Sequence, residues 1–170
     1  MAVSAYIGIG SNLGRPHENC LEAVDRLKSI PATRLEAVSP WYSSRPVGVE
    51  NQGWFVNGAA RLETGLPARE LLRHLLRIES EMGRVRKERW EARIIDLDLV
   101  LYGSRRICDN ALTVPHPRMD ERRFVLVPLM DLEPDLVHPV LGIPVWTLLA
   151  GLGTEGQELV PLKAGSACAS

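Results

Sequence analysis

Apolar residues recur along the first two thirds of the chain with spacings that predict six elements. Apolar runs of four to eight residues, or runs interrupted at every second position, predict strands, and apolar residues three or four positions apart predict amphipathic helices. Proline near a helix start and glycine or proline near its end mark two helices. The pattern predicts strands at 2–9, 34–42, 54–63 and 94–101, and helices at 16–30 and 67–82.

This β-α-β-β-α-β order is typical of a ferredoxin-like α+β sandwich, in which helices cover one face of a mostly antiparallel sheet. Beyond Gly103 the chain is rich in proline, and helical pieces are expected near 119–130 and 145–152. Because no repeat or linker divides the chain, we predict a single domain over 1–163 as a C-terminally extended version of this fold. Small and polar residues over 164–170 predict a disordered tail.

Composition limits the classes of function more than it selects one. The chain has 170 residues, is 45% hydrophobic and 24% charged, and has a formal net charge of −1. Such a balance predicts a globular protein without a general attraction to nucleic acid or membranes. The three cysteines lack metal-binding spacing, which favours reduced thiols, and no signal or membrane segment is evident. We therefore expect a cytoplasmic protein, and we also predict that it is a monomer.

The most informative chemistry is a pair of aspartates inside a buried strand. Asp96 and Asp98 lie within the apolar run 94–101, and residues two apart in a strand point to the same face. Their Cα atoms should be roughly 6.5 Å apart at about 3.3 Å per residue. Ile95, Leu97, Leu99 and Leu101 are expected to share the opposite face and to enter the core. Two carboxylates this close repel each other unless cations lie between them.

The segment 84–93 can supply these cations, because it carries four arginines and a lysine directly before the strand. Carboxylates facing guanidinium groups are typical of a site for Mg²⁺ and a polyphosphate. The alternative is a solvated strand face balanced by nearby arginines. The strongly apolar neighbours of the aspartates and the dense positive charge favour the functional interpretation.

Three further features are ambiguous from the residues alone. The glycine-rich segment 8–14 follows a strand, but its spacing fits neither a dinucleotide loop nor a P-loop and equally suits a tight turn. His116 lies between two prolines in a stiff loop and is either a surface residue or a phosphate contact. Asn57, on the same strand face as Phe55, could recognise a flat heterocycle by amide contacts and stacking, or could be a satisfied core asparagine.

Several segments together resemble one family, the 6-hydroxymethyl-7,8-dihydropterin pyrophosphokinases of folate biosynthesis. The resemblance extends in order from about Tyr6 to Leu129, and the combination of Arg-x-x-Asp-x-Asp with Pro-His is its most specific part. The segments that carry it are Gly10-Ser11-Asn12-Leu13-Gly14, Gly83-Arg84-Val85-Arg86, Arg89-Trp90, Arg93-Ile94-Ile95-Asp96-Leu97-Asp98 and Leu112-Thr113-Val114-Pro115-His116-Pro117.

The resemblance implies Mg²⁺-dependent transfer of pyrophosphate from ATP to the pterin hydroxymethyl group, with release of AMP. It implies that Asp96 and Asp98 hold two Mg²⁺ ions and that Arg84 and Arg93 act with them in catalysis. The residues implied for ATP binding are Arg86, Trp90, Leu99, Thr113, His116 and Arg122, with Leu99 and Thr113 acting through their backbones. The residues implied for pterin binding are Ser44, Pro46, Val47, Gly48, Phe55, Asn57 and Phe124, with the ring between Phe55 and Phe124.

This chain departs from the family pattern at Glu91 and Ala92, where Gly-Pro is usual. The added carboxylate lies beside the expected phosphates, although no metal ligand is lost. Two other classes of function stay open at this point. One is a different Mg²⁺-dependent phosphoryl or nucleotidyl transferase acting on a related pterin, and the other is a non-catalytic ferredoxin-like module that binds a small ligand.

Overall fold

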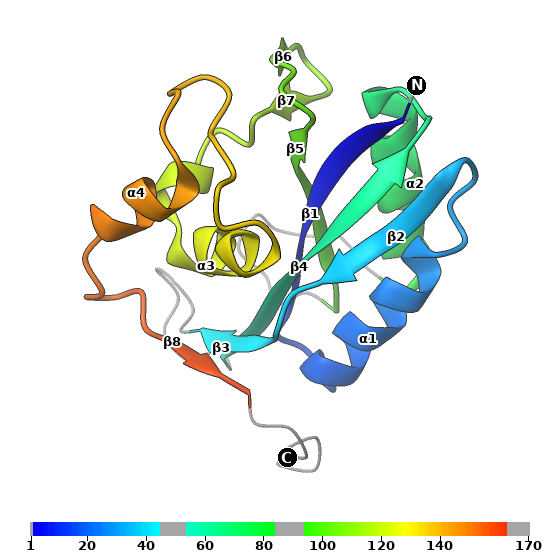
Figure 1. The fold of residues 1–170 in the computed structure, drawn as a ribbon. Helices are drawn as coiled ribbons and strands as arrows, with labels where there is room; N and C mark the ends of the chain where they lie inside the picture. The colour runs from blue at the N-terminus through cyan, green and yellow to red at the C-terminus, as the bar shows by residue number, and fades with distance from the viewer. Residues whose placement is uncertain (1, 45–53, 84–93, 163–170) are drawn as a thin grey trace.

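A computed structural model describes residues 2–44, 54–83 and 94–162, and the fold consists of an antiparallel sheet with helices on both faces (Figure 1). The elements at the N-terminal end and in the middle of the chain are β1 (Val3–Ser11), α1 (Pro16–Leu27), β2 (Thr33–Val38), β3 (Tyr42–Ser44), β4 (Phe55–Thr64), α2 (Ala68–Glu81) and β5 (Asp96–Tyr102). They are followed by β6 (Ile107–Cys108), β7 (Thr113–Val114), a 3₁₀ turn (Met119–Glu121), α3 (Arg123–Leu132), α4 (Val145–Ala150) and β8 (Leu159–Pro161).

The sheet has the strand order β5-β1-β4-β3-β8, and β2 pairs with the other end of β4. All these pairings are antiparallel. Alternate residues of β1 enter two different cores. Ala5, Ile7 and Ile9 pack with α1 and α2, whereas Tyr6 packs with α3 and Ala59 of β4. The sheet is therefore buried on both faces, and the face that carries α3 also carries the polar residues described below.

The predicted strands and helices are present, with three differences in detail. β1 continues through Gly8 and Gly10 to Ser11 instead of ending at Ile9. The strand predicted at 34–42 is divided into β2 and β3, which pair with successive parts of β4 on either side of the irregular segment 39–41. The helix predicted to continue to Ile30 ends at Leu27, although Ile30 is still buried.

A β-bulge corrects the predicted face of Leu101. Leu99 pairs with Ile7 and Leu101 with Tyr6, so that Val100 is an extra residue in β5. Beyond the bulge the alternation is shifted by one residue. Leu97 and Leu99 enter the core on the face opposite the aspartates, as predicted, and pack with α1 and α2, whereas Leu101 and Val100 pack under α3.

The C-terminal third contains the two predicted helical pieces and two features that were not predicted. A short hairpin of β6 and β7 precedes a cis Val114–Pro115 bond. β8 pairs with β3, which brings the end of the described chain beside the strand that precedes residue 45 (Figure 1). None of the helices in the described residues is long and apolar enough to cross a membrane. Cys20 and Cys108 are not in disulfides, and Cys168 lies outside the described residues.

Candidate active site

Asn57, Asp96 and Asp98 lie on the sheet face that carries α3, around a floor made by two glycines. Gly10 of β1 pairs with Asn57 of β4 on one side and with Asp96 of β5 on the other. Gly8 is likewise opposite Ala59 and Asp98. Since directly paired residues of a sheet share a face, the aspartates and Asn57 project from the same surface, and no side chain stands between them.

The glycine at position 10 is required by close approach rather than by backbone conformation. A Cβ atom on Gly10 would lie 2.9 Å from Oδ1 of Asn57. Adjacent strands are about 4.8 Å apart, so the Cα atoms of Asn57 and Asp96 are separated by roughly 10 Å across Gly10. The floor therefore leaves space for flat or charged groups of a small molecule between an amide and a carboxylate.

On the β4 side of the floor, Asn57 is buried and its amide donates a hydrogen bond to Oγ of Ser44. Ser44 pairs with Phe55, so these three residues form one edge of the site. Phe124, in the first turn of α3, comes from above the sheet, and the guanidinium carbon of Arg122 lies 5.5 Å from the centre of its ring. That distance is typical of a cation–π contact.

On the β5 side, the proline loop places His116 and Arg122 near the aspartates. The backbone N–H of His116 donates to the carbonyl of Val100 at 2.9 Å, which attaches the loop to β5. Burial lowers the pKa of His116 below its usual value of 6.5, and the charge of Arg122 lowers it further, whereas Asp96 opposes the shift. His116 is therefore neutral at pH 7 and lies within the electrostatic reach of both residues.

The proton of His116 can be assigned to one ring nitrogen. Its Nδ1 accepts a hydrogen bond from the backbone N–H of Arg118 at 3.2 Å. In a neutral ring the other nitrogen, Nε2, then carries the proton and is a donor. A neutral imidazole with an Nε2–H donor is suited to a hydrogen bond with a phosphate oxygen.

Glu79 of α2, which was not predicted as a site residue, holds the backbone of β5 between the two aspartates. Glu79 is 3% exposed, and its carboxylate accepts a hydrogen bond from the N–H of Leu97 at 2.7 Å. The bond occupies the outer edge of β5, which pairs with no other strand in the described part of the chain. A buried glutamate on an amphipathic helix was the available signal, because such a carboxylate needs a partner.

The turn after β1 is connected to the start of β5. Oγ of Ser11 donates to the carbonyl of Ile94, and the amide of Asn19 donates to Oγ of Ser11 at 3.2 Å and to the carbonyl of Leu13 at 2.8 Å. Gly14 has a φ of 67°, which favours glycine. The segment 10–14 is thus the end of a strand and a pinned turn beside Asp96.

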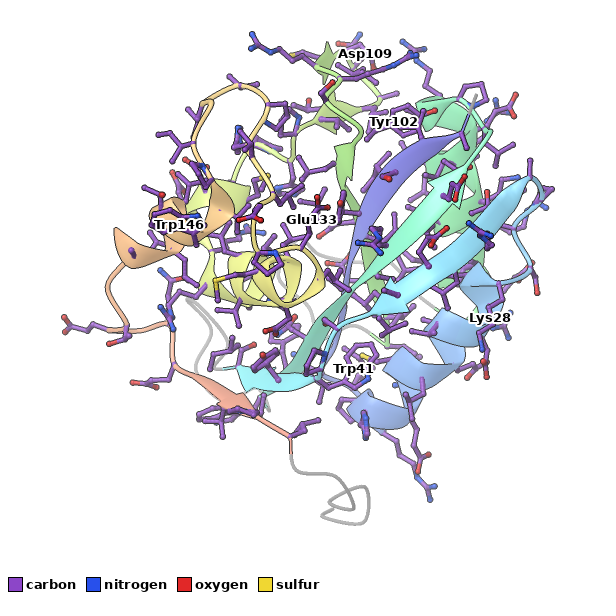
Figure 2. All side chains as sticks on the ribbon, viewed as in Figure 1. Lys28, Trp41, Tyr102, Asp109, Glu133 and Trp146 are labelled. Atoms are coloured by element: carbon purple, nitrogen blue, oxygen red, sulfur yellow. The ribbon has the colours of Figure 1, made fainter. Side chains whose placement is uncertain are left out.

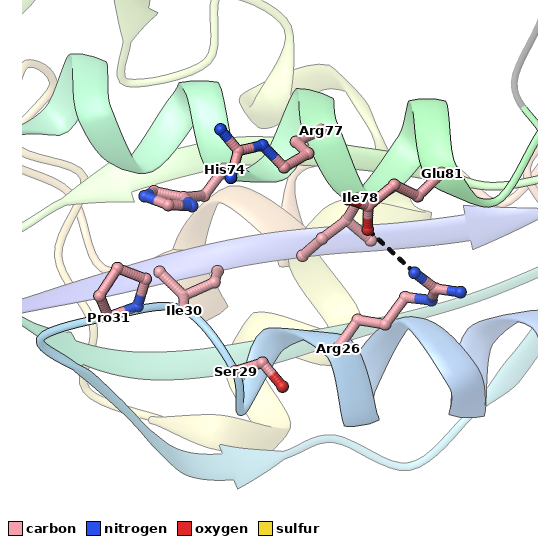
Figure 3. Close-up of a pocket in the computed structure, with 8 residues that line it drawn as sticks. All are labelled: Arg26, Ser29, Ile30, Pro31, His74, Arg77, Ile78 and Glu81. Atoms are coloured by element: carbon pink, nitrogen blue, oxygen red, sulfur yellow. Dashed lines mark hydrogen bonds and ion pairs between the residues drawn. The ribbon is translucent and has the colours of Figure 1, made fainter.

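Ten of the residues predicted for the site lie in the described part of the chain, on or next to the elements that border the floor. The other seven lie outside the described residues. Those outside are Pro46, Val47, Gly48, Arg84, Arg86, Trp90 and Arg93, as are the departures Glu91 and Ala92. Leu99 has its side chain in the core, consistent with a backbone role, and Thr113 lies in β7, which is next to β5. A separate groove of about 370 Å³ lies between α1 and α2 and contains none of the predicted residues (Figure 3).

Solved structures share this fold at low sequence identity. A Plasmodium falciparum protein titled HPPK-DHPS, crystallised with pteroate, aligns with a TM-score of 0.71 and 15% identity over 88% of this chain and 42% of its own. A further structure, titled HPPK-DHPS in complex with substrates, aligns with a TM-score of 0.69. The chain thus spans less than half the length of these proteins and shares the fold of one part of them.

Curated relatives are much closer in sequence, and they define the class as a kinase of folate synthesis. The 2-amino-4-hydroxy-6-hydroxymethyldihydropteridine pyrophosphokinase of Pseudomonas aeruginosa is 46% identical over 95% of this chain and 99% of its own length. The enzyme of the same name from Methylorubrum extorquens is 41% identical over 92% of this chain and 98% of its own. Folic acid synthesis protein fol1 of Schizosaccharomyces pombe is 40% identical, and the match covers 21% of that protein.

The family description 7,8-dihydro-6-hydroxymethylpterin-pyrophosphokinase matches residues 6–134, and the chain belongs to this family. The family resemblance deduced from the sequence is confirmed. The alternative of a non-catalytic binding module is thereby set aside in favour of an enzyme.

Proposed function

We propose that the glycine floor is where ATP and 6-hydroxymethyl-7,8-dihydropterin meet, with the pterin on the β4 side and the phosphates on the β5 side. The reaction is the transfer of pyrophosphate from ATP to the pterin hydroxymethyl oxygen during folate biosynthesis, with AMP as the leaving group. The observation that carries the proposal is the row Asn57–Gly10–Asp96, in which a glycine keeps open the space between an amide and a carboxylate.

The pterin side has the groups that a flat, polar ring requires. We propose that the amide of Asn57 pairs with the donor and acceptor edge of the pterin, supported by its hydrogen bond to Ser44. Phe55 and Phe124 would stack on the two faces of the ring. The predicted contacts of Pro46, Val47 and Gly48 complete this side as proposals from the family resemblance.

The β5 side fits Mg²⁺ bound together with a polyphosphate. Among the described residues no group of three or more His, Cys, Asp or Glu could hold a metal ion alone. Asp96 and Asp98 supply two carboxylates, and Mg²⁺ in phosphoryl-transfer sites usually takes one or two carboxylates and completes its shell with phosphate oxygens and water. We propose two Mg²⁺ ions here, which would neutralise phosphate charge and activate the hydroxymethyl oxygen.

Several residues would orient ATP on this side. We propose that Nε2–H of His116 and the guanidinium of Arg122 contact phosphate oxygens, and that the remaining arginines named by the resemblance, Arg84, Arg86 and Arg93, stabilise charge in the transition state with Trp90 beside them. The backbone of Leu99 points to the same outer edge of β5 as that of Leu97, because alternate residues share an edge. We propose that this edge and the backbone of Thr113 bind adenine.

The finer structural predictions are proposals of the same kind. The strand order supports a ferredoxin-like arrangement. β4 lies between β1 and β3, which belong to the half that contains α1, and β1 lies between β4 and β5, which are joined by α2. We propose that 1–163 function as one domain, as a monomer in the cytoplasm and without nucleic-acid partners.

The test is direct. The purified chain should release AMP from ATP only when both hydroxymethyl-dihydropterin and Mg²⁺ are present, and the pterin product should carry the pyrophosphate. Release of ADP, or transfer of the adenylyl group to the pterin, would assign a different transferase to this site.

A further inference from the structure

Two buried tyrosines of the sheet are hydrogen-bonded to the C-terminal end of α3. The hydroxyl of Tyr6 donates to Oε2 of Glu133, and the hydroxyl of Tyr42 donates to Oδ2 of Asp131. The tyrosines are 4% and 9% exposed. Figure 2 shows Glu133 between α3 and the sheet. These contacts join segments that are 127 and 89 residues apart in the sequence.

The two bonds lie on opposite sides of the strand over which α3 packs. In the sheet order β1-β4-β3, Tyr6 belongs to β1 and Tyr42 to β3, whereas α3 rests on β4. Leu126 and Leu129 are fully buried at that contact. Apolar burial holds the helix against the sheet but does not fix its direction. Two hydrogen bonds, one on each side of β4, restrain rotation of the C-terminal end of the helix over the sheet.

The N-terminal turn of α3 lacks one intrahelical hydrogen bond. Pro128 has no N–H, so the carbonyl of Phe124 receives no intrahelical bond from the residue four positions later. The side chain of Arg122 makes no capping hydrogen bond, and the backbone N–H of Arg123 donates to Oε1 of Gln157 at 2.9 Å. The position of Phe124 therefore depends on this one contact and on the orientation of the rest of the helix. It lies about 10 Å along the axis from Asp131, at 1.5 Å per residue.

We propose that Tyr42 and Tyr6 are positioning residues for the pterin, because they orient α3 and thereby set the distance between Phe124 and Phe55. The inference rests on the proposed pterin site. If the loss of a tether let the helix tilt by roughly 10° at its C-terminal end, Phe124 would move by about 2 Å over the length of the helix. Misplacement of about 1 Å at a reacting site can cost on the order of 10²-fold in rate.

The proposed restraint should be present across the physiological pH range. Burial, followed by the hydrogen bond to the acidic partner, raises the pKa of both tyrosines to about 12. Both hydroxyls therefore remain donors well above neutral pH. The effect of removing them should not depend on pH between 6 and 9.

The experiment compares three variants that each remove one tyrosine hydroxyl. Tyr42→Phe and Tyr6→Phe remove a tether, and Tyr102→Phe is the matched control, because Tyr102 is also buried and donates to the carbonyl of Leu66 at 2.5 Å, away from α3. We expect Tyr42→Phe to raise the KM for pterin about tenfold and to leave the KM for ATP within about twofold. The double variant should have a larger effect, and Tyr102→Phe should leave both values unchanged.

Two acidic variants test whether the hydrogen bond itself is responsible. Asp131→Asn keeps an acceptor oxygen and should retain most of the affinity for pterin, whereas Asp131→Ala should resemble Tyr42→Phe. If Tyr42→Phe did not fold, as judged by urea unfolding, the two Asp131 variants would decide the question. Equal KM values for pterin in Tyr42→Phe and Tyr102→Phe, with an active parent enzyme, would overturn the proposal. An inactive parent enzyme would instead refute the proposed function.

Discussion

Gly10→Ala is the sharpest test of the proposed floor. The new methyl group would lie 2.9 Å from Oδ1 of Asn57, closer than Cβ atoms are found in folded proteins. Asn57 is buried and bonded to Ser44, so its amide can yield only by breaking that contact. The substitution should therefore move the amide away from the position in which it would bind the pterin.

The expected loss of pterin affinity follows from the hydrogen bond that is broken, and the change in stability follows from two opposing effects. Loss of a buried hydrogen-bonding edge costs about 1–3 kcal/mol. At 1.4 kcal/mol per factor of ten, the affinity for pterin should fall roughly 5- to 150-fold. Stability should change less. Overpacking costs about 1–3 kcal/mol, but replacing glycine by alanine recovers about 0.4–1 kcal/mol through the entropy of the unfolded chain.

The assay is fluorescence titration with the pterin, accompanied by ATP titration and urea unfolding. Gly65→Ala is the matched control, because its Cβ would meet the nearest atom, the carbonyl oxygen of Ala32, at an ordinary 3.7 Å and far from Asn57. In an Asn57→Ala background the clash disappears, so Gly10→Ala should then cost little, and the two effects should be strongly non-additive. Unchanged pterin affinity in Gly10→Ala, or simple additivity with Asn57→Ala, would refute the reasoning.

Three further outcomes are expected. Asp96→Asn and Asp98→Asn should each fold normally and lose Mg²⁺-dependent turnover by on the order of 10²-fold or more, and retained activity at ordinary Mg²⁺ would contradict the metal site. Glu79→Ala should lower the free energy of urea unfolding by about 1–3 kcal/mol by leaving the N–H of Leu97 unpaired, whereas Glu79→Gln should cost less. Burial is the main cause that lowers the pKa of His138 below 6.5 in the folded protein. As pH falls, the unfolded chain therefore binds a proton at this histidine before the folded protein does. Its contribution to stability should be complete above pH 6.5 and be lost on acidification, and His138→Asn should flatten that part of the stability curve.

Local patterns determined most of the fold. Period-two and helical spacing located β1, β4, β5, α1 and α2. Each of these elements buries an apolar face, and the spacing of its apolar residues along the sequence indicates that face. The aspartate pair was visible for the same reason: two charges in an apolar strand must share a face. The resemblance of short motifs was sufficient to identify the family, because the Arg-x-x-Asp-x-Asp and Pro-His segments are specific in combination.

Local patterns failed where a residue's role depends on a distant segment. From the sequence, Gly8 and Gly10 were interpreted as turn residues. Their role in a strand became evident only from the pairing that places Gly10 between Asn57 and Asp96. β8 is three residues long, and β3 offers the edge that it needs to form a strand. The bulge at Val100 reversed the predicted face of Leu101, because register is set by the pairing strand and not by the strand itself.

The amino-acid order by itself, together with the family resemblance, supplied the candidate residues for binding Mg²⁺, phosphate and pterin, because carboxylates, guanidinium groups and aromatic rings belong to the side chains. Only the tertiary structure decided how they are arranged: a row across β4, β1 and β5, an open floor at Gly10, and α3 attached on both sides of β4 by Tyr6 and Tyr42. Those relations join residues up to 127 positions apart. They arise from strand register and helix packing, which depend on the whole chain. Such contacts produce no periodic pattern in the sequence from which they could be predicted.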